Sequence, residues 1–409
     1  MRKLYTSLMI PFTIYAQDLS ELISRSLENQ LVNSSKQNID GLNLEYESIK
    51  SGYLPNIVVG SSYIDTSKET AAIPNNGVVS YATINYTLYD GGAKKSIYNK
   101  YKSNIKSANE DLNTLKNNLT LEVINYYYSY ATLQALKEAK IKECEQLKEQ
   151  QNRLEKFYEV GTTTLDEVQK IISRYQAENL ALHQLELSIQ RVLHNLEYIT
   201  NQEVDITLGS TIIEPIIKEN LLRSELKALE YEIQSSLDTA KEIKSANYPN
   251  ITLNNTYSFY NQNYNNQIYQ DNSIDSQNIF TLNLSWRLYD FDTNSKKYQS
   301  AIKKHQALKS KYEYEKNKAN IDLKLAKKEY KIAKLKISSA TASLKAATSA
   351  YETIEAKYKN GLVDSVAYLE ALSEKYRALA LLKESQYDLE IKKANIIYHS
   401  GENLKGFVK

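Results

Sequence analysis

Few residues of this chain could carry out covalent or metal chemistry. The single cysteine, Cys144, permits neither an internal disulfide nor a cluster of thiolate ligands, and we interpret it as a small buried hydrophobic residue. The four histidines have no spacing typical of metal ligands: His183, His194, His305 and His399. Gly91-Gly92 lacks the flanking residues of a phosphate loop or a nucleophile turn. The sequence therefore predicts no enzyme, no catalytic residue, no metal site and no cofactor.

The composition points to long elements in an exported chain. Only 11 glycines and 5 prolines interrupt the 409 residues, and no stretch reaches the about 20 apolar residues of a membrane-spanning helix. Basic Arg2 and Lys3, followed by an apolar run from Leu4 to Tyr15, predict a signal peptide over residues 1–16.

The charge balance argues against a nucleic-acid partner. Without Arg2 and Lys3 the 51 Lys and Arg fall to 49, which equals the 49 Asp and Glu. A neutral chain lacks the basic excess that holds a phosphate backbone. Lysines are dense between Lys296 and Lys336, but they surround an apolar heptad and are typical of the solvated face of a helix.

The chain is duplicated, and the matching segments lie about 200 residues apart. The matches are Tyr53–Ile57 with Tyr248–Ile251, Ile84–Asp90 with Leu284–Asp290, and Lys156–Gly161 with Ala356–Gly361. We predict a first repeat over residues 17–200, a linker over 201–217, a second repeat over 218–400 and a C-terminal tail over 401–409. The second copy carries an insertion at about residues 261–277. Asp290-Phe291-Asp292 replaces Asp90-Gly91-Gly92, so we expect the second strand-to-helix junction to differ in shape.

Each repeat contains two segments with the alternation of a membrane β-strand. We predict strands at about residues 56–66, 79–90, 250–260 and 278–290. The last has the clearest pattern, with one apolar, membrane-facing row made of Phe280, Leu282, Leu284, Trp286 and Leu288. An ordinary sheet packed on a core is the alternative from the strands alone.

Two very long helices set the scale of the molecule. No proline or glycine occurs from Ala93 to Tyr158 or from Thr293 to Tyr358, which at 1.5 Å per residue gives helices of about 100 Å. A heptad of alternating small and large residues in the second predicts close packing along its length. Shorter helices follow tip turns at about residues 158–164 and 358–364, where Gly161 and Gly361 end the long helices.

These parts together predict a duct. Four strands cannot close a barrel in lipid, because open edges would leave backbone groups without partners, so several chains must share one barrel. A signal peptide places that barrel in an outer membrane, and the long helices then project into the periplasm.

The order of short motifs resembles that of the TolC outer-membrane efflux family. These motifs are Leu88-Tyr89-Asp90-Gly91-Gly92, Tyr158-x-x-Gly161, Tyr358-x-x-Gly361 and Tyr368-Leu369-Glu370-Ala371. The resemblance implies a mostly α fold: a duplicated helix-strand-strand-helix-helix unit that forms a long α-helical barrel and gives four strands to a shared 12-stranded outer-membrane β-barrel. It also implies a homotrimer in outer-membrane lipid, a periplasmic adaptor (membrane fusion) protein, and an inner-membrane pump of the proton-driven or ABC type.

The resemblance also implies functional residues at the two tip turns. Tyr358 and Glu167 match a pair that latches the periplasmic gate, while Val363 stands where the family has an arginine. Glu370 keeps one of two entrance acids, and Ala367 replaces the other. The predicted gate residues are Tyr358, Glu167, Asp166, Asp364 and Glu370, and the predicted adaptor contacts are Val160, Gly161, Asn360 and Gly361. We therefore expect a weaker latch and a single acidic ring.

The functional hypothesis is a passive exit duct for multidrug or other small-molecule efflux in a tripartite export system. The alternative within the same class is type I protein secretion, since the pump selects the cargo. The alternative of another class is a periplasmic coiled-coil structural protein, which the heptads alone would favour.

Overall fold

The computed structural model describes residues 17–216 and 222–409. The predicted signal peptide, the last residue of the predicted linker and the first residues of the predicted second repeat lie outside the described residues. The chain is mostly helical with one four-stranded antiparallel sheet, which confirms the predicted fold class. It divides into a sheet unit, Ser35–Asp111 and Glu225–Glu315, and a tip unit that includes Leu112–Ser224 and Lys316–Lys409.

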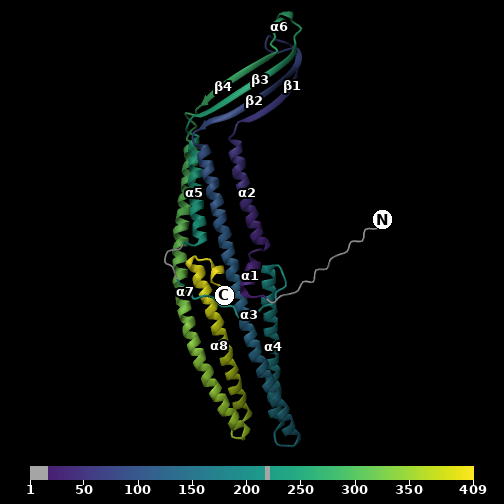
Figure 1. The fold of residues 1–409 in the computed structure, drawn as a ribbon, viewed down its shortest axis with the longest axis vertical. Coiled ribbons are helices and arrows are strands. Elements are labelled where there is room, and N and C mark those ends of the chain that lie inside the picture. Colours follow the sequence, from purple (N-terminus) through teal and green to yellow (C-terminus); the bar gives the residue numbers. More distant parts are fainter. Residues whose placement is uncertain (1–16, 217–221) are drawn as a thin grey trace, which may run out of the picture. The chain divides into compact units, whose positions relative to one another are not determined.

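The sheet unit contains strands from both repeats. They are β1 (Asn56–Asp65), β2 (Asn76–Asp90), β3 (Asn250–Asn263) and β4 (Ser276–Ser285), in that spatial order (Figure 1). Every neighbouring pair is antiparallel. Ile57 pairs with Ile84, Ile84 with Asn255, and Asn255 with Phe280, so these positions share one face. This register brings the apolar rows predicted for separate strands onto a single face.

The fourth strand is shorter than predicted. It ends at Ser285, which pairs with Asn250, the first residue of β3, rather than at residue 290. Pro249 precedes Asn250 and has no N–H to continue the ladder. The assignment of Trp286 and Leu288 to the strand is therefore wrong. Both follow the strand as exposed residues, and the Trp286 indole N–H donates to the Asn247 carbonyl at 3.0 Å.

The two strand-to-helix junctions have the same type of backbone, contrary to the expected difference. Gly91 and Gly92 have φ of 70° and 90°, and Phe291 and Asp292 have φ of 52° and 62°. The aspartate before each junction also caps the helix that follows: Asp90 accepts from Lys94 N at 2.6 Å, and Asp290 accepts from Asn294 N at 3.0 Å. The architecture therefore imposes this left-handed turn even where no glycine is present.

Long helices leave the sheet without interruption. Helices α3 (Ala93–Glu159) and α7 (Thr293–Lys359) have 67 residues each, which corresponds to about 100 Å, and both continue into the tip unit. The sheet unit also holds most of α2 (Gln30–Gly52) and nearly all of α5 (Ser224–Ser245), while the short α6 (Gln267–Asp271) lies in the predicted insertion. None of the helices in the described part of the chain is both long and apolar enough to cross a membrane.

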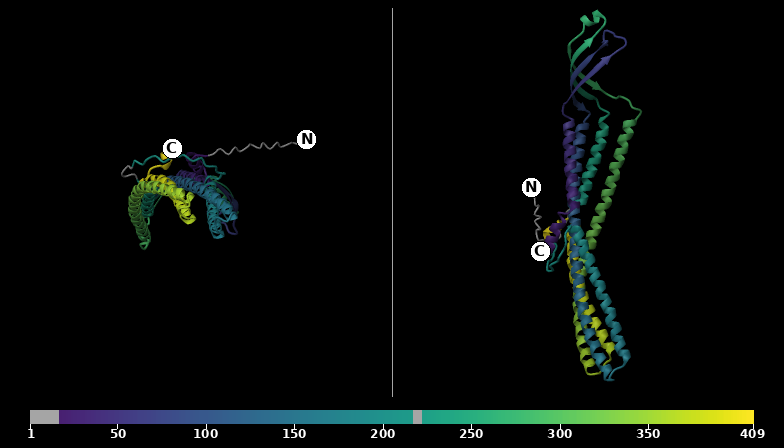
Figure 2. Two further views of the ribbon diagram at one scale, coloured as in Figure 1. Left: turned by 90° about the horizontal axis from the view of Figure 1, so that it is seen from below. Right: turned by 90° about the vertical axis from the view of Figure 1, so that its right-hand side faces the viewer.

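The tip unit contains two helical hairpins. Helix α4 (Leu165–Thr200) returns along α3, and α8 (Ser365–Ser400) returns along α7 (Figure 2). Their shared core near the turns includes Leu147 and Leu154 from α3, Ile171 from α4, Tyr351 from α7 and Leu372 from α8. On α7 the heptad of small residues is buried, as at Ala326, Ala333 and Ala340. The predicted heptad is thus the packing face of this helix.

The segments predicted as linker and tail pair with each other. Thr211 and Lys409 exchange two backbone hydrogen bonds of 3.0 Å, and Ile213 N donates to the Phe407 carbonyl at 2.8 Å, beside the 3₁₀ turn η1 (Leu404–Phe407). Two helices precede the first strand, and the Asn29 side chain caps the second of them, α2, by accepting from Val32 N. This leaves α1 (Leu19–Ser26) as a separate element.

Candidate functional site

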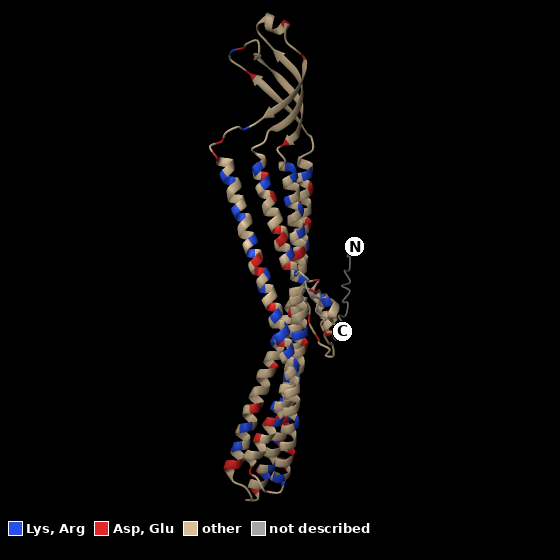
Figure 3. Cartoon of the chain, turned by 90° about the vertical axis from the view of Figure 1, so that its left-hand side faces the viewer, with Lys and Arg blue, Asp and Glu red and all other residues tan. Residues whose placement is uncertain are grey.

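The sheet presents two chemically different faces. On one, Phe280, Leu282 and Leu284 are 64%, 60% and 67% exposed. On the other, polar side chains bond from strand to strand: the Thr83 and Thr256 hydroxyls lie 2.9 Å apart, and Asn254 bonds to Asn85 and Asn283. Figure 3 shows charged residues only toward the ends of the strands. One face thus suits hydrocarbon, and the other suits water.

The tip turns are near copies of each other. Each ends its long helix with the same pair of backbone bonds: Gly161 N donates to Tyr158 O and Thr162 N to Phe157 O, while Gly361 N donates to Tyr358 O and Leu362 N to Lys357 O. The two glycines have φ of 75° and 72°, a conformation that favours glycine. A Cβ at either would meet no atom within 4 Å. Backbone conformation, not crowding, requires glycine here.

All four residues predicted to contact an adaptor lie on the exposed surface of these turns. Val160 is 71% exposed, and Gly161, Asn360 and Gly361 are also exposed. The Asn360 side chain donates to the Ala356 carbonyl at 2.8 Å, which ties it to its own helix. The turns therefore offer two small, similar surfaces with little side-chain bulk.

The predicted gate pair is brought close, but each member bonds elsewhere. The Tyr358 hydroxyl accepts from the Gln150 amide, and Glu167 accepts from the Ser365 hydroxyl. Tyr358 also stacks on Tyr368, with ring centroids 4.8 Å apart and an interplanar angle of 17°. Burial raises the pKa of Tyr358, so its hydroxyl stays protonated at neutral pH.

Arg153 supplies a cation that sequence reasoning missed. Its guanidinium lies 5.8 Å from the centre of the Tyr358 ring and 5.2 Å from that of Phe157. Val363 lacks the family's arginine, but α3 places a positive charge beside the same tyrosine from another helix. Only three-dimensional packing reveals this, since Arg153 and Tyr358 are about 200 residues apart in sequence.

The remaining gate acids have separate surroundings. Asp364 caps α8 by accepting from Ala367 N at 2.9 Å, and Asp166 forms an exposed ion pair with Lys170 at 2.6 Å. Glu370 is exposed and lines a groove of about 750 Å³ between α4, α7 and α8, together with Arg174 and Arg377. Of the predicted acids, Glu370 is thus the one beside an open groove.

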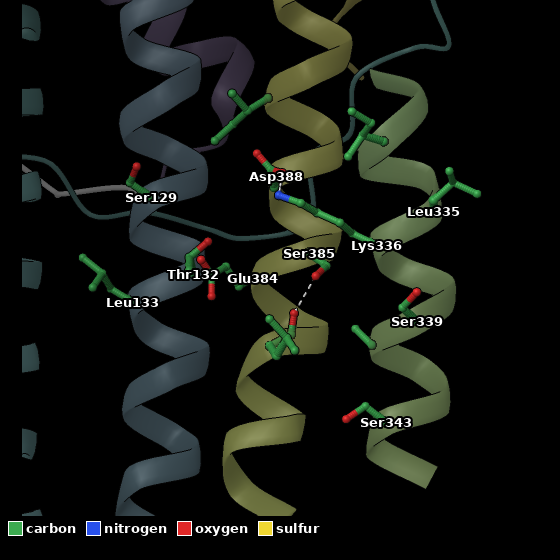
Figure 4. Close-up of a pocket in the computed structure, with 14 residues that line it drawn as sticks. Ser129, Thr132, Leu133, Leu335, Lys336, Ser339, Ser343, Glu384, Ser385 and Asp388 are labelled. Atoms are coloured by element: carbon green, nitrogen blue, oxygen red, sulfur yellow. Dashed lines mark hydrogen bonds and ion pairs between the residues drawn. The ribbon is translucent and has the colours of Figure 1, made fainter. Parts of the chain in front are cut away.

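A larger groove of about 900 Å³ lies higher in the tip unit, between α3, α7 and α8 (Figure 4). Serine and threonine hydroxyls line it beside exposed Ile332 and Leu335. Lys336 reaches across it toward Asp388 at 3.6 Å. The groove thus combines apolar and small polar side chains with one ion pair.

Cys144 has the buried environment predicted for it. Its side chain is 7% exposed, and burial, followed by the nearby Glu143 carboxylate, raises the pKa of its thiol. A raised pKa disfavours the reactive thiolate. Among the described residues, no group of three or more His, Cys, Asp or Glu side chains is placed to hold a metal ion.

Comparison with known proteins decides what kind of molecule carries these features. The family model described as "Outer membrane efflux protein" matches residues 22–202 and 218–402, which are nearly the whole chain and correspond to the two repeats. The chain belongs to the outer membrane efflux protein family. The resemblance found in its motifs is confirmed.

Solved structures of this fold support the same conclusion. The chain is similar to the outer membrane protein VceC of Vibrio cholerae, with 15% identity, a TM-score of 0.83, and coverage of 94% of this chain and 96% of that one. The CmeC outer membrane channel of Campylobacter jejuni is 15% identical with a TM-score of 0.82, and the match covers 95% of this chain and 86% of that one. The open MtrE outer membrane channel of Neisseria gonorrhoeae is 14% identical with a TM-score of 0.75, and the match covers 94% of this chain and 89% of that one. No curated protein matches the chain.

Family membership gives the protein its compartment and its class. It lies in the outer membrane, with its helical part in the periplasm. Channels of this family are passive ducts rather than enzymes, are trimeric, and work with adaptor and inner-membrane pump partners. This favours a channel over a periplasmic coiled-coil structural protein. The roles of the individual gate and contact residues remain predictions.

Proposed function

We propose that this protein is the outer-membrane component of a tripartite export system that carries drugs or other small molecules out of the cell. It provides a passive exit duct for substrates that an inner-membrane pump delivers through a periplasmic adaptor. The observation that carries the proposal is the two-faced sheet, apolar on one side and lined with Asn and Thr on the other, in a chain of the efflux family. The polar face would line the pore.

The edges of this sheet support self-association, and the trimeric state of the family's channels supports three copies. Strands β1 and β4 each have one neighbour in the chain, so each exposes a row of unpaired backbone groups. Both are 10 residues long, and pairing β4 of one copy with β1 of the next would close a barrel without an open edge.

The tip unit also exposes apolar positions that a neighbouring copy could cover. On α4, Leu180 and Leu187 are 60% and 53% exposed at a spacing of one heptad. On α7, Ile332 and Leu335 are 52% and 62% exposed. Exposed residues at heptad spacing on long helices are typical of helix-packing faces.

The tip turns would contact the adaptor, and the gate would lie beside them. Val160, Gly161, Asn360 and Gly361 give the docking surface its small side chains. Tyr358, Glu167, Asp166 and Asp364 would hold the gate, and Glu370 would form an acidic ring in the trimer. Glycine turns with open space around them suit close approach by a partner.

Export by living cells tests this function. Deleting the gene should raise the retention of small fluorescent efflux substrates, and restoring it should return retention to the starting level. Unchanged dye retention together with the loss of a secreted protein from the medium would contradict small-molecule efflux and support type I protein secretion.

Variants of the turns test the adaptor contact separately. Gly161→Trp or Gly361→Trp should abolish export while the detergent-purified protein stays trimeric. Asn152→Trp on the exposed surface of α3 serves as a control outside the turns. Full export by both glycine variants would contradict the assigned docking surface.

A further inference from the structure

A closed five-residue network joins the two hairpins of the tip unit above the gate. Lys140 Nζ donates to Glu143 Oε2 at 2.7 Å and to Glu178 Oε2 at 2.6 Å. Arg174 Nη2 donates to Glu178 Oε1 at 3.0 Å and to Ser373 Oγ at 2.7 Å. The Ser373 hydroxyl closes the cycle by donating to Glu143 Oε1 at 2.9 Å. Both oxygens of each carboxylate therefore have a partner.

The network is partly buried and electrically neutral. The side chains of Glu143 and Glu178 are 4% and 13% exposed, and that of Lys140 is 23% exposed. Burial alone would lower the pKa of Lys140, but the hydrogen bonds that its ammonium donates to Glu143 and Glu178 outweigh this effect, and the pKa is raised. The network thus pairs two basic side chains with two acidic ones.

The two hairpins contribute unequally to this network. All four charges belong to the first hairpin, with Lys140 and Glu143 on α3 and Arg174 and Glu178 on α4. The second hairpin contributes only the hydroxyl of Ser373 on α8.

Hydroxyl groups of the second hairpin also make the links closer to the turns. The Tyr358 hydroxyl accepts from Gln150, and the Ser365 hydroxyl donates to Glu167. The ion pairs recorded nearby stay within a hairpin, as Lys140–Glu178 does in the first and Lys359–Glu355 in the second.

We propose that Ser373 is the positioning residue that couples α8 to the first hairpin, and that α8 loosens locally when the Ser373 hydroxyl leaves the network. Losing this link breaks hydrogen bonds to a neutral hydroxyl only, and every charge of the network keeps an opposite charge beside it on α3 or α4. A salt bridge between the hairpins would instead expose two unpaired charges, which is strongly unfavourable in a partly buried site. Links through hydroxyl groups can therefore hold α8 in place in the closed tip and still be broken when the tip opens.

This inference rests on the proposed function, because it assigns the movement to a gate. A measurement of the protein itself keeps the two apart. Hydrogen exchange of backbone amides reports the local opening of α8 whether or not the protein conducts ions.

Ser373→Ala tests the coupling. Amide exchange of α8 around residues 369–377 should rise about tenfold, while exchange of α4 around residues 171–178 stays unchanged, because Arg174 and Glu178 keep their oppositely charged partners. Ser373→Thr should restore the slow exchange, since it keeps the hydroxyl. Ser385→Ala is the matched control: it is a buried serine on the same helix whose hydroxyl bonds to the carbonyl of Leu381 in that helix.

Conductance in planar lipid bilayers completes the test. Ser373→Ala should spend about tenfold more time in the open state than the wild type and the Ser385→Ala control. Exchange and open time equal to those of the wild type would overturn the proposal. A wild type that never conducts, combined with faster α8 exchange in Ser373→Ala, would contradict the channel function and leave the coupling intact.

Discussion

The two repeats reach the same backbone at their junctions through different residues. In the first repeat Gly91 and Gly92 take the left-handed conformation, in which glycine meets no steric penalty. In the second, Phe291 and Asp292 take it at a cost of about 1 kcal/mol or more each. Phe291 is also 80% exposed, and its ring centroid lies 4.8 Å from that of Tyr289. The architecture therefore dictates the turn, and the second copy maintains it under strain.

At the tip turns the two repeats keep the same residue as well as the same backbone. Both turns keep their glycine and the same capping bonds, so the backbone has not diverged. The side chains near the turns have diverged. The first repeat holds buried charged side chains, and the second repeat bonds to them through hydroxyl groups. Divergence between the copies thus appears in side-chain chemistry at the tip and in backbone strain at the junction.

Removing a charge from the first repeat should have the largest effect. Glu143→Ala leaves Lys140 and Ser373 without one partner each in a buried site, and we expect it to lower the free energy of unfolding by about 3 kcal/mol. Thermal unfolding of the detergent-solubilised protein at fixed concentration measures this. Glu186→Ala, at a 44% exposed side chain paired with Lys137, should cost less than about 1 kcal/mol. Equal losses would show that the network is no more than a surface ion pair.

The junction of the first repeat should tolerate no side chain at Gly91. A Cβ there would lie 2.3 Å from the Ser245 carbonyl oxygen, so Gly91→Ala should destabilise by about 2–3 kcal/mol. Gly92→Ala is the control, because it has positive φ but no atom within 4 Å, and should cost about 1 kcal/mol. The difference between the melting temperatures of Gly91→Ala and Gly92→Ala measures the effect of the clash with Ser245 apart from that of backbone strain. Identical melting temperatures would contradict the clash.

Relief of strain in the second repeat should be stabilising. Phe291→Gly places a permissive residue at a φ of 52°, and we expect the free energy of unfolding to rise by about 1 kcal/mol in detergent. Phe291→Ala removes the ring but not the strain, and it should leave stability nearly unchanged. A loss of stability in both variants would show that the exposed ring makes a stabilising contact that outweighs the strain.

The smallest effect on stability is expected at Glu370. Glu370→Ala should change the free energy of unfolding by less than about 0.5 kcal/mol, because the side chain is exposed. It should nevertheless lower cation selectivity in lipid bilayers severalfold, since it removes the proposed acidic ring. Glu374→Ala, one turn further along the same groove, is the comparison variant. Unchanged selectivity in Glu370→Ala alone would remove Glu370 from the entrance.

Sequence periodicity was enough to predict the fold because its signals are long and regular. The absence of glycine and proline predicted α3 and α7, and alternation predicted four strands whose apolar rows share one face. The end of β4 could not be predicted, because alternation continues through Trp286 and Leu288 while the partner strand begins only at Asn250. Pairing partners, not residue type, end a strand.

The candidate site was less accessible to sequence reasoning. Motif spacing located the turns and Tyr358, since glycine and tyrosine recur in both repeats. Arg153, Gln150 and Ser373 carry no local pattern, and only the packing of helices from opposite ends of the chain brings them to the site. Hydrogen-bond partners therefore had to come from the structure.

The central claim is that this chain is one subunit of an outer-membrane channel. The most direct test is to extract the protein from outer membranes in detergent, determine its mass, and record currents after insertion into a planar lipid bilayer. We predict a particle of three chains that conducts ions in discrete steps. A monomer that stays soluble without detergent and passes no current would contradict the account.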